Sequence, residues 1–474
     1  MSSTAPTPAG LPVVVIGAGP VGLAAAAHLA ERGQDFLVLE SGPAAGAAIS
    51  EWGHVRLFSP WRYDIDPAAR RLLEADGWTA PDPGNLPTGG ELVTDYLEPL
   101  AKLPALAGNI RYGARVTGIG RVGIDRVRSR GREQAPFLIR LADGTEITAR
   151  AVVDASGTWR TPNVLGATGL PAHGEQRVAH LVDHALPDIA GADRDTFAGR
   201  HTLVVGAGHS AANTLLALGQ LATERPGTTV TWAIRASSAA RSYGGGDADA
   251  LPARGALGTR LRDLVTSGQV RLLTGFATHT VRPVARAGGD GVEVVGADGR
   301  TVTVDRIVAA TGYRPDHTIA AELRLDLDPV LGSTRDLAPL IDPNEHSCGT
   351  VPPHGAAELS HPEPGYYAIG VKSYGRAPTF LLATGYEQAR SVVAALAGDW
   401  DAARDVQLEL PETGVCSSNP VPDGAAPAES CGTGGGCGTP APVDVRRGLA
   451  TGVSGGLLTG SLPLVEATGG GCCG

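Results

Sequence analysis

The stretch LPVVVIGAGPVGLAAAAHLAERGQDFLVLE, residues 11–40, decides the fold of this chain. β-Branched residues fill positions 13–16, which predicts a buried parallel strand. Three glycines follow at once in the spacing GxGxxG, at Gly17, Gly19 and Gly22. The first suits a sharp turn, the second lets a pyrophosphate approach the backbone, and the third lets a helix pack closely on the strand. The pattern therefore predicts a strand, a tight turn and a helix whose amino terminus faces phosphate groups.

An acidic residue closes this stretch. Gly33 stands where the predicted helix needs a left-handed residue at its end, and a second apolar strand leads to Glu40. A carboxylate at that distance from the glycines accepts hydrogen bonds from the ribose hydroxyls of an adenine dinucleotide. Strand, glycines, helix, second strand and acid together predict a dinucleotide site, and an accidental glycine-rich turn is the alternative.

The same organisation occurs a second time in the chain. A strand is predicted at residues 201–205, and Gly206-Ala207-Gly208-His209-Ser210-Ala211 follows it in a GxGxxA form of the turn. A helix is predicted from residue 213 to about residue 222, and a strand over residues 229–234, which ends at Arg235. The chain therefore contains two similar dinucleotide units.

Each unit continues into predicted antiparallel strands and a closing segment of small residues. The strands turn at Asp143-Gly144 and Asp298-Gly299, and the closing segments are Ala155-Ser156-Gly157 and Ala310-Thr311-Gly312. In the first unit the strands are predicted at residues 110–122 and 137–149. Only the first unit carries an insertion, roughly residues 41–106.

Two nucleotide units in one chain imply two nucleotides that react with each other. The usual solution is a flavin held by one unit and a nicotinamide cofactor that visits the other, so that a hydride passes between them. The predicted fold class is α/β with two nested Rossmann-like dinucleotide-binding domains. The FAD-binding domain is discontinuous, at residues 11–160 and 310–400, and residues 161–309 form the NADP-binding domain.

Composition excludes several classes of protein. With 474 residues the chain is long enough for two or three domains, and its net charge of −10 argues against nucleic acid or an anionic membrane as a partner. The apolar run at residues 11–30 is explained by the nucleotide turn rather than by a signal or membrane segment. We therefore expect a cytoplasmic protein, and its oligomeric state is left open between monomer and homodimer.

The paired turns, the closing segments and the order of the parts resemble the flavin-containing monooxygenases and their disulfide-reductase relatives over about residues 11–396. The segment KSYGRAPTF, residues 372–380, is more narrowly similar to flavin-binding monooxygenase-like proteins encoded in bacterial arsenic-resistance clusters. The residues expected to bind FAD are then Gly17, Gly19, Pro20, Gly22, Glu40, Val116, Ser156, Gly157 and Gly370. Those expected on the NADPH side are Gly206, Gly208, Ser210, Ala211, Arg235, Arg241, Thr311 and Gly312.

The chain departs from these families in two places. The monooxygenase motif FxGxxxH is missing, since Pro171-Ala172-His173-Gly174 is followed by His180 at a longer spacing. Relatives of the thioredoxin reductase type have Gly-Asp on the flavin ribityl chain, where this chain has Gly370-Val371-Lys372. Lys372 is therefore the predicted catalytic residue, a compact cation that stabilises reduced flavin, and chance retention of a lysine is the alternative.

Cysteines decide where electrons can go. The first of the six cysteines is Cys348, so the nucleotide units lack the dithiol that a disulfide reductase needs beside its flavin. Electrons must leave to molecular oxygen, to a bound substrate or to external thiols. His346, Cys348, His354 and His361 form a conceivable soft-metal cluster, although the prolines around them favour an irregular loop.

The insertion gathers aromatic residues in a chain that has few. They either wall a substrate pocket over the flavin or form the local core of the insertion. These residues are Trp52, Phe58, Trp61, Arg62 and Tyr63.

From residue 411 to residue 474 the composition predicts a disordered tail that holds the remaining cysteines. The vicinal pair Cys472 and Cys473 resembles the end of mercuric reductase, and two thiolates can chelate a trivalent metalloid. The predicted function is an FAD-dependent, NADPH-oxidising, monooxygenase-like enzyme that acts on a small soft substrate such as a trivalent arsenical. The alternatives are a metalloid-sequestering flavoprotein and an NADPH-dependent reductase of external thiols.

Overall fold

The first nucleotide unit is built on a parallel sheet. A computed structural model describes residues 10–184, 186–244, 252–286, 289–346 and 351–408. The sheet has five strands in the order β16 (Tyr366–Ala368), β7 (Ala151–Asp154), β1 (Val13–Ile16), β2 (Phe36–Leu39) and β3 (Ile110–Arg111). All residues of β1 and β7 are buried, as expected for strands covered on both faces. The predicted tail lies outside the described residues.

One predicted strand was assigned to the wrong sheet. Residues 110 and 111 were expected to begin the antiparallel strands, but β3 pairs in parallel with β2 through Val38 and Ile110. Two residues are too few to show a hydrophobic period, so the sequence could not distinguish the two pairings. The antiparallel sheet consists of β4 (Val116–Arg121), β5 (Phe137–Leu141) and β6 (Glu146–Ala149).

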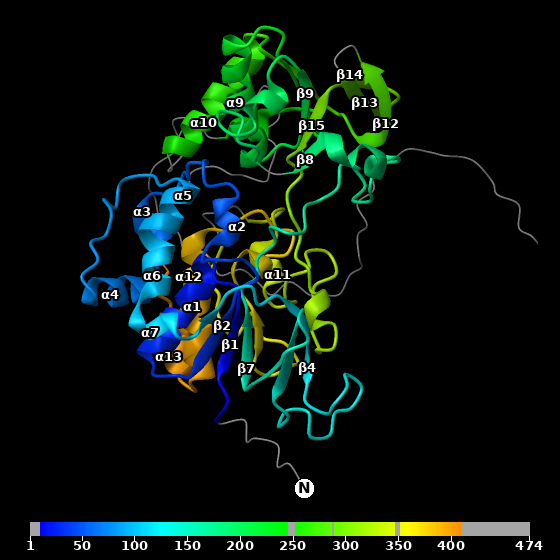
Figure 1. Cartoon of the computed structure of the whole chain (residues 1–474). Coiled ribbons are helices and arrows are strands. Elements are labelled where there is room, and N and C mark those ends of the chain that lie inside the picture. The colour runs from blue at the N-terminus through cyan, green and yellow to red at the C-terminus, as the bar shows by residue number, and fades with distance from the viewer. Residues whose placement is uncertain (1–9, 185, 245–251, 287–288, 347–350, 409–474) are drawn as a thin grey trace, which may run out of the picture. The chain divides into compact units, whose positions relative to one another are not determined.

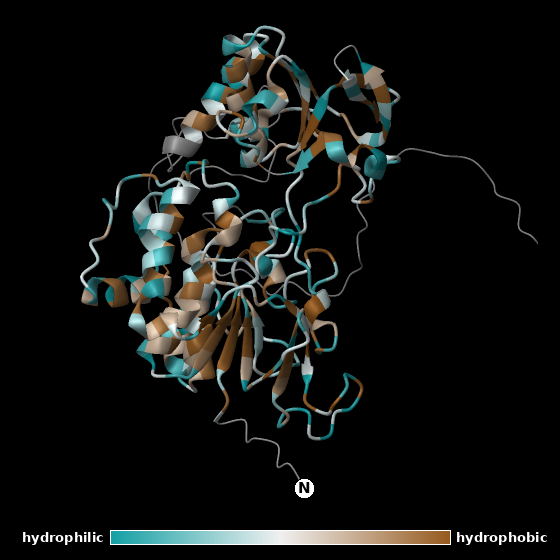
Figure 2. Cartoon of the chain, in the orientation of Figure 1, coloured by the Kyte–Doolittle hydropathy of each residue, from teal (hydrophilic) through white to brown (hydrophobic). Residues whose placement is uncertain are grey.

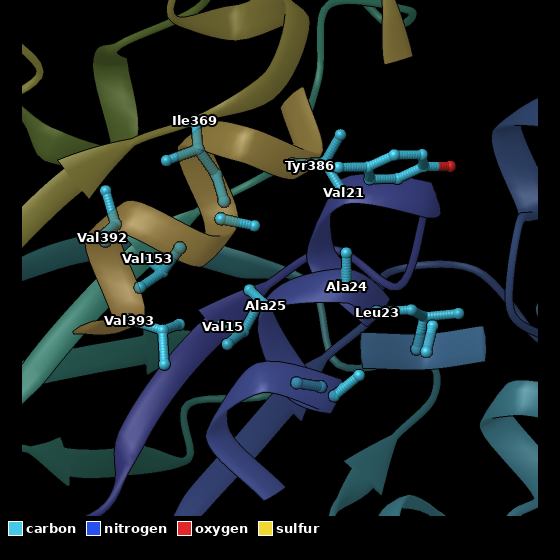
Figure 3. Close-up of a cluster of buried hydrophobic side chains, with 14 of the residues drawn as sticks. Val15, Val21, Leu23, Ala24, Ala25, Val153, Ile369, Tyr386, Val392 and Val393 are labelled. Atoms are coloured by element: carbon cyan, nitrogen blue, oxygen red, sulfur yellow. The ribbon is translucent and has the colours of Figure 1, made fainter. Parts of the chain in front are cut away.

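Two helices pack together on one face of the first sheet. They are α1 (Pro20–Glu31) and α12 (Leu382–Leu396), which contact each other closely. Figure 3 shows Val21, Leu23 and Ala25 of α1 in the same apolar cluster as Val392 and Val393 of α12. The run of alanines in α1 is fully buried, and such small side chains let helix and sheet approach closely. The opposite face of the sheet packs on β4, β5 and β6.

The second unit repeats this plan. Its parallel sheet has the order β11 (Val270–Leu273), β10 (Thr229–Ala233), β9 (His201–Val205), β15 (Arg306–Ala309) and β8 (Val182–His184). Helices α9 (His209–Glu224) and α10 (Pro252–Thr266) lie on the same side of it (Figure 1). The antiparallel strands β12 (Thr278–Arg286), β13 (Gly289–Gly296) and β14 (Thr301–Val304) pack on the other face. The predicted fold class is therefore confirmed.

The insertion of the first unit is helical and covers α1. It comprises α2 (Ala47–Ser50), α3 (Trp61–Asp64), α4 (Pro67–Ala75), α5 (Gly89–Glu91), the π-helix η2 (Leu92–Leu97), α6 (Glu98–Lys102) and α7 (Pro104–Ala107). The shorter elements elsewhere are η3 (Glu175–Leu181), α8 (Arg194–Phe197), η4 (Ala240–Tyr243), η6 (Thr318–Ala320), α11 (Ala338–Ile341), η7 (Gly370–Lys372) and α13 (Trp400–Arg404). Figure 2 shows that the apolar residues gather in the strands of both sheets. Among the described residues, none of the helices has the length and apolar character needed to cross a membrane.

Two chain crossings connect the units, and they are hydrogen-bonded to each other. Pro162 on the outward crossing forms an antiparallel bridge with Tyr313 on the return. The Asn163 N–H donates to the Gly312 carbonyl at 2.9 Å, and the Thr311 hydroxyl donates to the Asn163 carbonyl at 2.8 Å. The second unit therefore leaves and rejoins the first at one point.

Candidate functional site

The three glycines of the first turn have different surroundings. Gly17 has a φ of +100°, and a Cβ there would lie 2.7 Å from the Ala155 carbonyl oxygen. A Cβ on Gly22 would lie 2.0 Å from the Gly17 carbonyl oxygen. At Gly19, by contrast, no described atom lies within 4 Å of the Cβ position. The first and third glycines are therefore required for packing, whereas the second opens onto free space where a pyrophosphate fits.

Helix α1 begins at this open position. Its N-cap is Gly19 and Pro20 is its first residue, and within the described chain no side chain caps it. The N–H groups of the first turn have no partner inside the helix, and together with the helix dipole they favour an anion. The turn thus fits the phosphates of a dinucleotide without further change.

The Glu40 carboxylate accepts hydrogen bonds from the turn and keeps acceptor capacity for a ligand. Glu40 directly follows β2 and is 9% exposed. One carboxylate oxygen accepts the Ala18 N–H at 2.7 Å, and the other accepts the Gly42 N–H at 2.6 Å. The Ser41 hydroxyl also donates to Oε1 at 3.3 Å. Because a carboxylate has about four acceptor positions, one remains for a ribose hydroxyl. Glu40 therefore fits the predicted role and also fixes the loop around it.

The remaining predicted FAD segments meet at the same turn. Ser156 follows β7, and its Cα lies 3.3 Å from the Cβ position of Gly17. Gly370 follows β16 with a φ of +72°, and a Cβ there would lie 3.4 Å from Val21 at the start of α1. Gly157 adjoins the segment after Gly370, since a Cβ added to Gly157 would lie 4.0 Å from the Val371 side chain.

Val116 lies somewhat apart from these segments. It is in β4, within an apolar cluster that also contains Ile16 and Leu39 at the ends of β1 and β2. Its predicted contact with FAD stays a prediction.

The second turn has the same geometry as the first. Gly206 has a φ of +137°, and a Cβ there would lie 2.1 Å from the Ala310 carbonyl oxygen, whereas the Cβ position of Gly208 has no described atom within 4 Å. Helix α9 begins at His209, earlier than the predicted residue 213, because Gly208 is its N-cap. Ala211 is fully buried in place of the third glycine, and Ser210 lies beside it in the first turn of the helix.

Two arginines lie beyond the strand that follows the second turn. Arg235 comes just after β10, is exposed, and donates to the Ala167 carbonyl at 3.1 Å. Arg241 is an exposed residue of η4. Its neighbour Ser242 donates to the Ala207 carbonyl at 3.0 Å, which ties η4 to the turn. Both cations thus lie near the edge of the sheet at which a 2′-phosphate is expected.

The aromatic residues of the insertion divide into two groups. Trp61 is 4% exposed and belongs to the core. Phe58 contacts His209 of the second turn, with ring centroids 4.9 Å apart. Trp52 contacts Trp159 at 6.4 Å, and Trp159 stacks on Tyr313 at 5.1 Å. The core interpretation therefore holds for Trp61 and in part for Trp52, which packs against the same core and also contacts the crossing. Phe58 contacts the second turn, and Arg62 lies over the ring of Tyr63.

Trp159 and Tyr313 were missed by the sequence analysis. Each comes shortly after a closing segment of small residues, and that shared position could have identified them. Trp159 also donates to Glu51 of the insertion at 2.8 Å.

The described members of the conceivable soft-metal cluster, His346, His354 and His361, do not form a metal site among themselves. Within the described part of the chain, histidine, cysteine and acidic side chains nowhere come together in a set that could hold a metal ion. His354 contacts the Pro352 carbonyl and the Gln388 amide, and His361 accepts the Asp326 N–H at 3.2 Å. Cys348, Cys472 and Cys473 lie outside the described residues.

With this geometry, the family of the chain can be assigned. The family model described as pyridine nucleotide-disulphide oxidoreductase matches residues 14–348. The chain belongs to this family. Pyridine nucleotide-disulphide oxidoreductases bind FAD and use NAD(P)H, so the predicted cofactors are confirmed at that level. The preference for NADPH stays a prediction.

Similar proteins include monooxygenases and reductases. The indole-3-pyruvate monooxygenase YUCCA1 of Oryza sativa subsp. japonica is 31% identical over 199 residues, which are 42% of each chain. The bacillithiol disulfide reductase of Bacillus cereus is 19% identical with a TM-score of 0.59, covering 82% of this chain and 99% of its own. The FAD-bound cadaverine monooxygenase of Erwinia amylovora is 16% identical with a TM-score of 0.56, covering 87% and 98%. At these identities the solved structures show a shared fold.

Within this oxidoreductase fold, Lys372 is not an isolated cation. Its side chain is 1% exposed, and Nζ donates to Asp154 Oδ2 at 2.6 Å and to the Ser156 hydroxyl at 3.0 Å. Burial alone would raise the pKa of Asp154, but Lys372 and the Ser156 hydrogen bonds lower it below its ordinary value. Asp154 was missed by the sequence analysis, although an acid at the end of the apolar strand AVVD is unusual. The catalytic role predicted for Lys372 stays a prediction.

We expect Glu40→Gln to weaken FAD binding about tenfold, because the amide replaces a charge-assisted acceptor and sets an N–H₂ group against a backbone N–H. The measurement is titration of the apoprotein with FAD, followed by flavin fluorescence. Glu31→Gln is the matched control, since Glu31 lies on α1 and pairs only with the exposed Arg71 among the described side chains. Equal affinities of Glu40→Gln and wild type would contradict the ribose assignment.

We expect Arg235→Ala to raise the KM for NADPH about tenfold and to leave the KM for NADH unchanged, because a guanidinium binds the 2′-phosphate that only NADPH carries. Steady-state kinetics with both nucleotides test this. Arg177→Ala, another exposed arginine of the second unit, is the control. A similar rise for both nucleotides would show that Arg235 supports the fold rather than selecting the phosphate.

Proposed function

We propose that this chain is an FAD-dependent enzyme that oxidises NADPH and passes the electrons to molecular oxygen, as a monooxygenase of a small soft substrate. One observation carries the proposal. Both nucleotide turns are complete, yet no cysteine occurs before Cys348, so neither unit has the dithiol through which a disulfide reductase would pass electrons. The similarity to the rice indole-3-pyruvate monooxygenase, over 42% of that protein, supports an oxygen-dependent outcome.

The residues of the chain bind and orient the two nucleotides. The second turn receives the NADPH pyrophosphate at the amino terminus of α9, and Arg235 and Arg241 select the 2′-phosphate. The first turn and Glu40 hold the adenosine half of FAD, while Ser156 and Gly370 border the remainder. When bound, FAD supplies a ring that accepts a hydride and reacts with oxygen. The aromatic residues at the crossings restrict water near that ring.

The substrate we propose is a trivalent arsenical. The segment at residues 372–380 supports this through its resemblance to proteins of arsenic-resistance clusters, and the terminal Cys472 and Cys473 provide soft thiolate ligands. The proposed reaction is balanced. Arsenite, oxygen, NADPH and a proton give arsenate, NADP⁺ and water, so that arsenic and NADPH each lose two electrons and oxygen accepts four.

The deciding experiment uses the full-length holoenzyme with arsenite. We expect NADPH oxidation, oxygen uptake and arsenate formation in equal amounts. Oxygen uptake that yields only hydrogen peroxide, with no arsenate, would overturn arsenite as the substrate. Truncation after residue 410 and the double variant Cys472→Ser/Cys473→Ser test the tail. We expect both to raise the arsenite KM, and unchanged values would exclude the tail from the chemistry.

A second function is favoured by the family itself. The chain matches the pyridine nucleotide-disulphide oxidoreductase family, and as a reductase it would have to pass electrons from the flavin straight to a disulfide bound from outside, because its nucleotide units lack a dithiol. Anaerobic NADPH oxidation driven by bacillithiol disulfide or oxidised glutathione, without any effect of arsenite, would establish that function in place of oxygenation. Tight arsenite binding without turnover would instead establish the sequestering alternative.

A further inference from the structure

The buried ion pair of Asp154 and Lys372 lies next to the segments expected to bind FAD, and the proposed function gives it no role. We propose that Asp154 and Lys372 form a charge-balanced pair that holds Ser156 at the FAD site and keeps a net buried charge from shifting the reduction potential of the flavin. Both are positioning residues: they hold Ser156 by hydrogen bonds, and their charges act on the flavin through space. The proposal rests on FAD binding by this chain and not on the identity of its substrate.

The pair is enclosed by the structure. Asp154 ends β7 and is 0% exposed, and Lys372 ends η7 and is 1% exposed. Oδ2 of Asp154 accepts from Lys372 at 2.6 Å and from the Tyr366 hydroxyl at 3.1 Å. Oδ1 accepts from the Ser156 hydroxyl at 2.6 Å and from its N–H at 3.1 Å. A buried ion pair is tolerated only when such additional hydrogen bonds satisfy it, so this cluster has one fixed arrangement.

Ser156 is the contact between the pair and the nucleotide site. It is exposed, whereas Asp154 and Lys372 are not. Its Cα lies 3.3 Å from the Cβ position of Gly17 in the first turn. Gly370, which begins η7, packs against Val21 of α1. The pair therefore adjoins the segments expected to border FAD. The Ser156 hydroxyl donates to Asp154 and accepts from Lys372, which leaves one lone pair to accept a hydrogen bond from FAD.

The surrounding ionisable groups add little charge. Burial and then Lys372 lower the pKa of His317, and burial lowers the pKa of His361 to about 4. Both rings are therefore neutral above pH 7. Burial and Asp154 raise the pKa of Tyr366, so this phenol stays protonated. Asp316, a surface carboxylate that also interacts with Lys372, is hydrogen-bonded to Thr318 and remains charged.

Removing Asp154 and removing Lys372 should shift the midpoint potential of the flavin in opposite directions. Reduction adds negative charge to the flavin, which a buried anion disfavours and a buried cation favours. Lys372→Met removes the cation that lowers the pKa of Asp154, so we expect a lower midpoint potential at a pH at which the carboxylate stays ionised. Asp154→Asn leaves Lys372 unbalanced, so we expect a higher one. The double variant Asp154→Asn/Lys372→Met is neutral again and should return close to the wild-type potential.

The experiment is spectroscopic titration of each holoprotein against a reference dye at pH 7.5, with FAD affinity measured alongside. Shifts of the same sign in both single variants, or no shift in either, would overturn the proposal. Ser156→Ala changes an exposed side chain and tests the positioning step even where a single variant fails to fold. We expect its FAD dissociation constant to rise about three- to tenfold, as for a lost hydrogen bond, and an unchanged constant would overturn that step.

Discussion

Gly19→Ala is expected to leave the apoprotein as stable as the wild type and to abolish FAD binding. Gly19 has a φ of −81° and a ψ of −174°, which alanine adopts without strain. No described atom lies within 4 Å of the new Cβ, so the folded chain accommodates the methyl group. The methyl group then occupies the space into which the pyrophosphate must approach. Thermal unfolding of the apoprotein and an FAD titration measure the two effects separately.

Gly22→Ala provides the contrasting variant. Its Cβ would lie 2.0 Å from the Gly17 carbonyl oxygen, so the backbone must move and the apoprotein itself should lose stability. Gly208→Ala is the matched variant in the second turn, and it should keep FAD and lose NADPH. If Gly19→Ala bound FAD with wild-type affinity, the pyrophosphate could not lie at this turn.

Asp64→Asn is expected to remove a pH dependence of stability worth about 4 kcal/mol. Asp64 is 1% exposed, and burial raises its pKa to about 7 despite a hydrogen bond from Ser59. Its Oδ2 has no partner among the described atoms. The ordinary pKa of an aspartate is 3.8, so burial shifts the pKa of Asp64 by about three units, each worth about 1.4 kcal/mol.

The sign follows from proton uptake. Between pH 4 and about 7 the folded protein holds a proton on Asp64 that the unfolded chain has released, so this contribution to stability is lost as the pH rises. His361 opposes it, because burial lowers the pKa of its ring to about 4 and the unfolded chain binds the extra proton. The informative quantity is therefore the difference between variant and wild type.

Urea unfolding at pH 5 and at pH 8 measures about 3 kcal/mol of this effect, because about two of the three pKa units lie above pH 5. Asp64→Asn should gain stability relative to wild type between the two values, because asparagine carries no charge at either pH. Ser59→Ala is a useful companion, since it removes the hydrogen bond that lowers the pKa of Asp64 and should extend the dependence to higher pH. Parallel profiles for Asp64→Asn and wild type would show that Asp64 is ionised in the folded protein throughout.

The parts of the fold that depend on neighbouring residues were predictable. Gly17, Gly19 and Gly22 each answer a steric requirement within one turn, so their spacing alone indicated the strand, the turn and the helix. The repetition of that pattern then predicted two units, and the fold class and the cofactors were confirmed. The domain boundaries, the individual site residues and the arsenical substrate remain predictions.

The features that depend on distant residues were not predictable. Asp154 and Lys372 are 218 positions apart, and neither position reveals its partner. The parallel pairing of β3 depends on where the inserted helices return the chain to the sheet. Trp159 and Tyr313 likewise stack only because two crossings far apart in sequence lie together. In each case tertiary packing brings the partners together, and no local pattern records it.

The paired crossings give the second unit the form of a module with a single attachment point. The chain segments that enter and leave it are held together by the bridge between Pro162 and Tyr313. A domain whose ends are neighbours can be removed and the gap closed by a short turn, without stretching the host sheet. The same closeness permits circular permutation, in which new ends are opened in a surface loop of the second unit. Exchange of whole nucleotide-binding modules between related enzymes would therefore need only one junction, made of two adjacent strands.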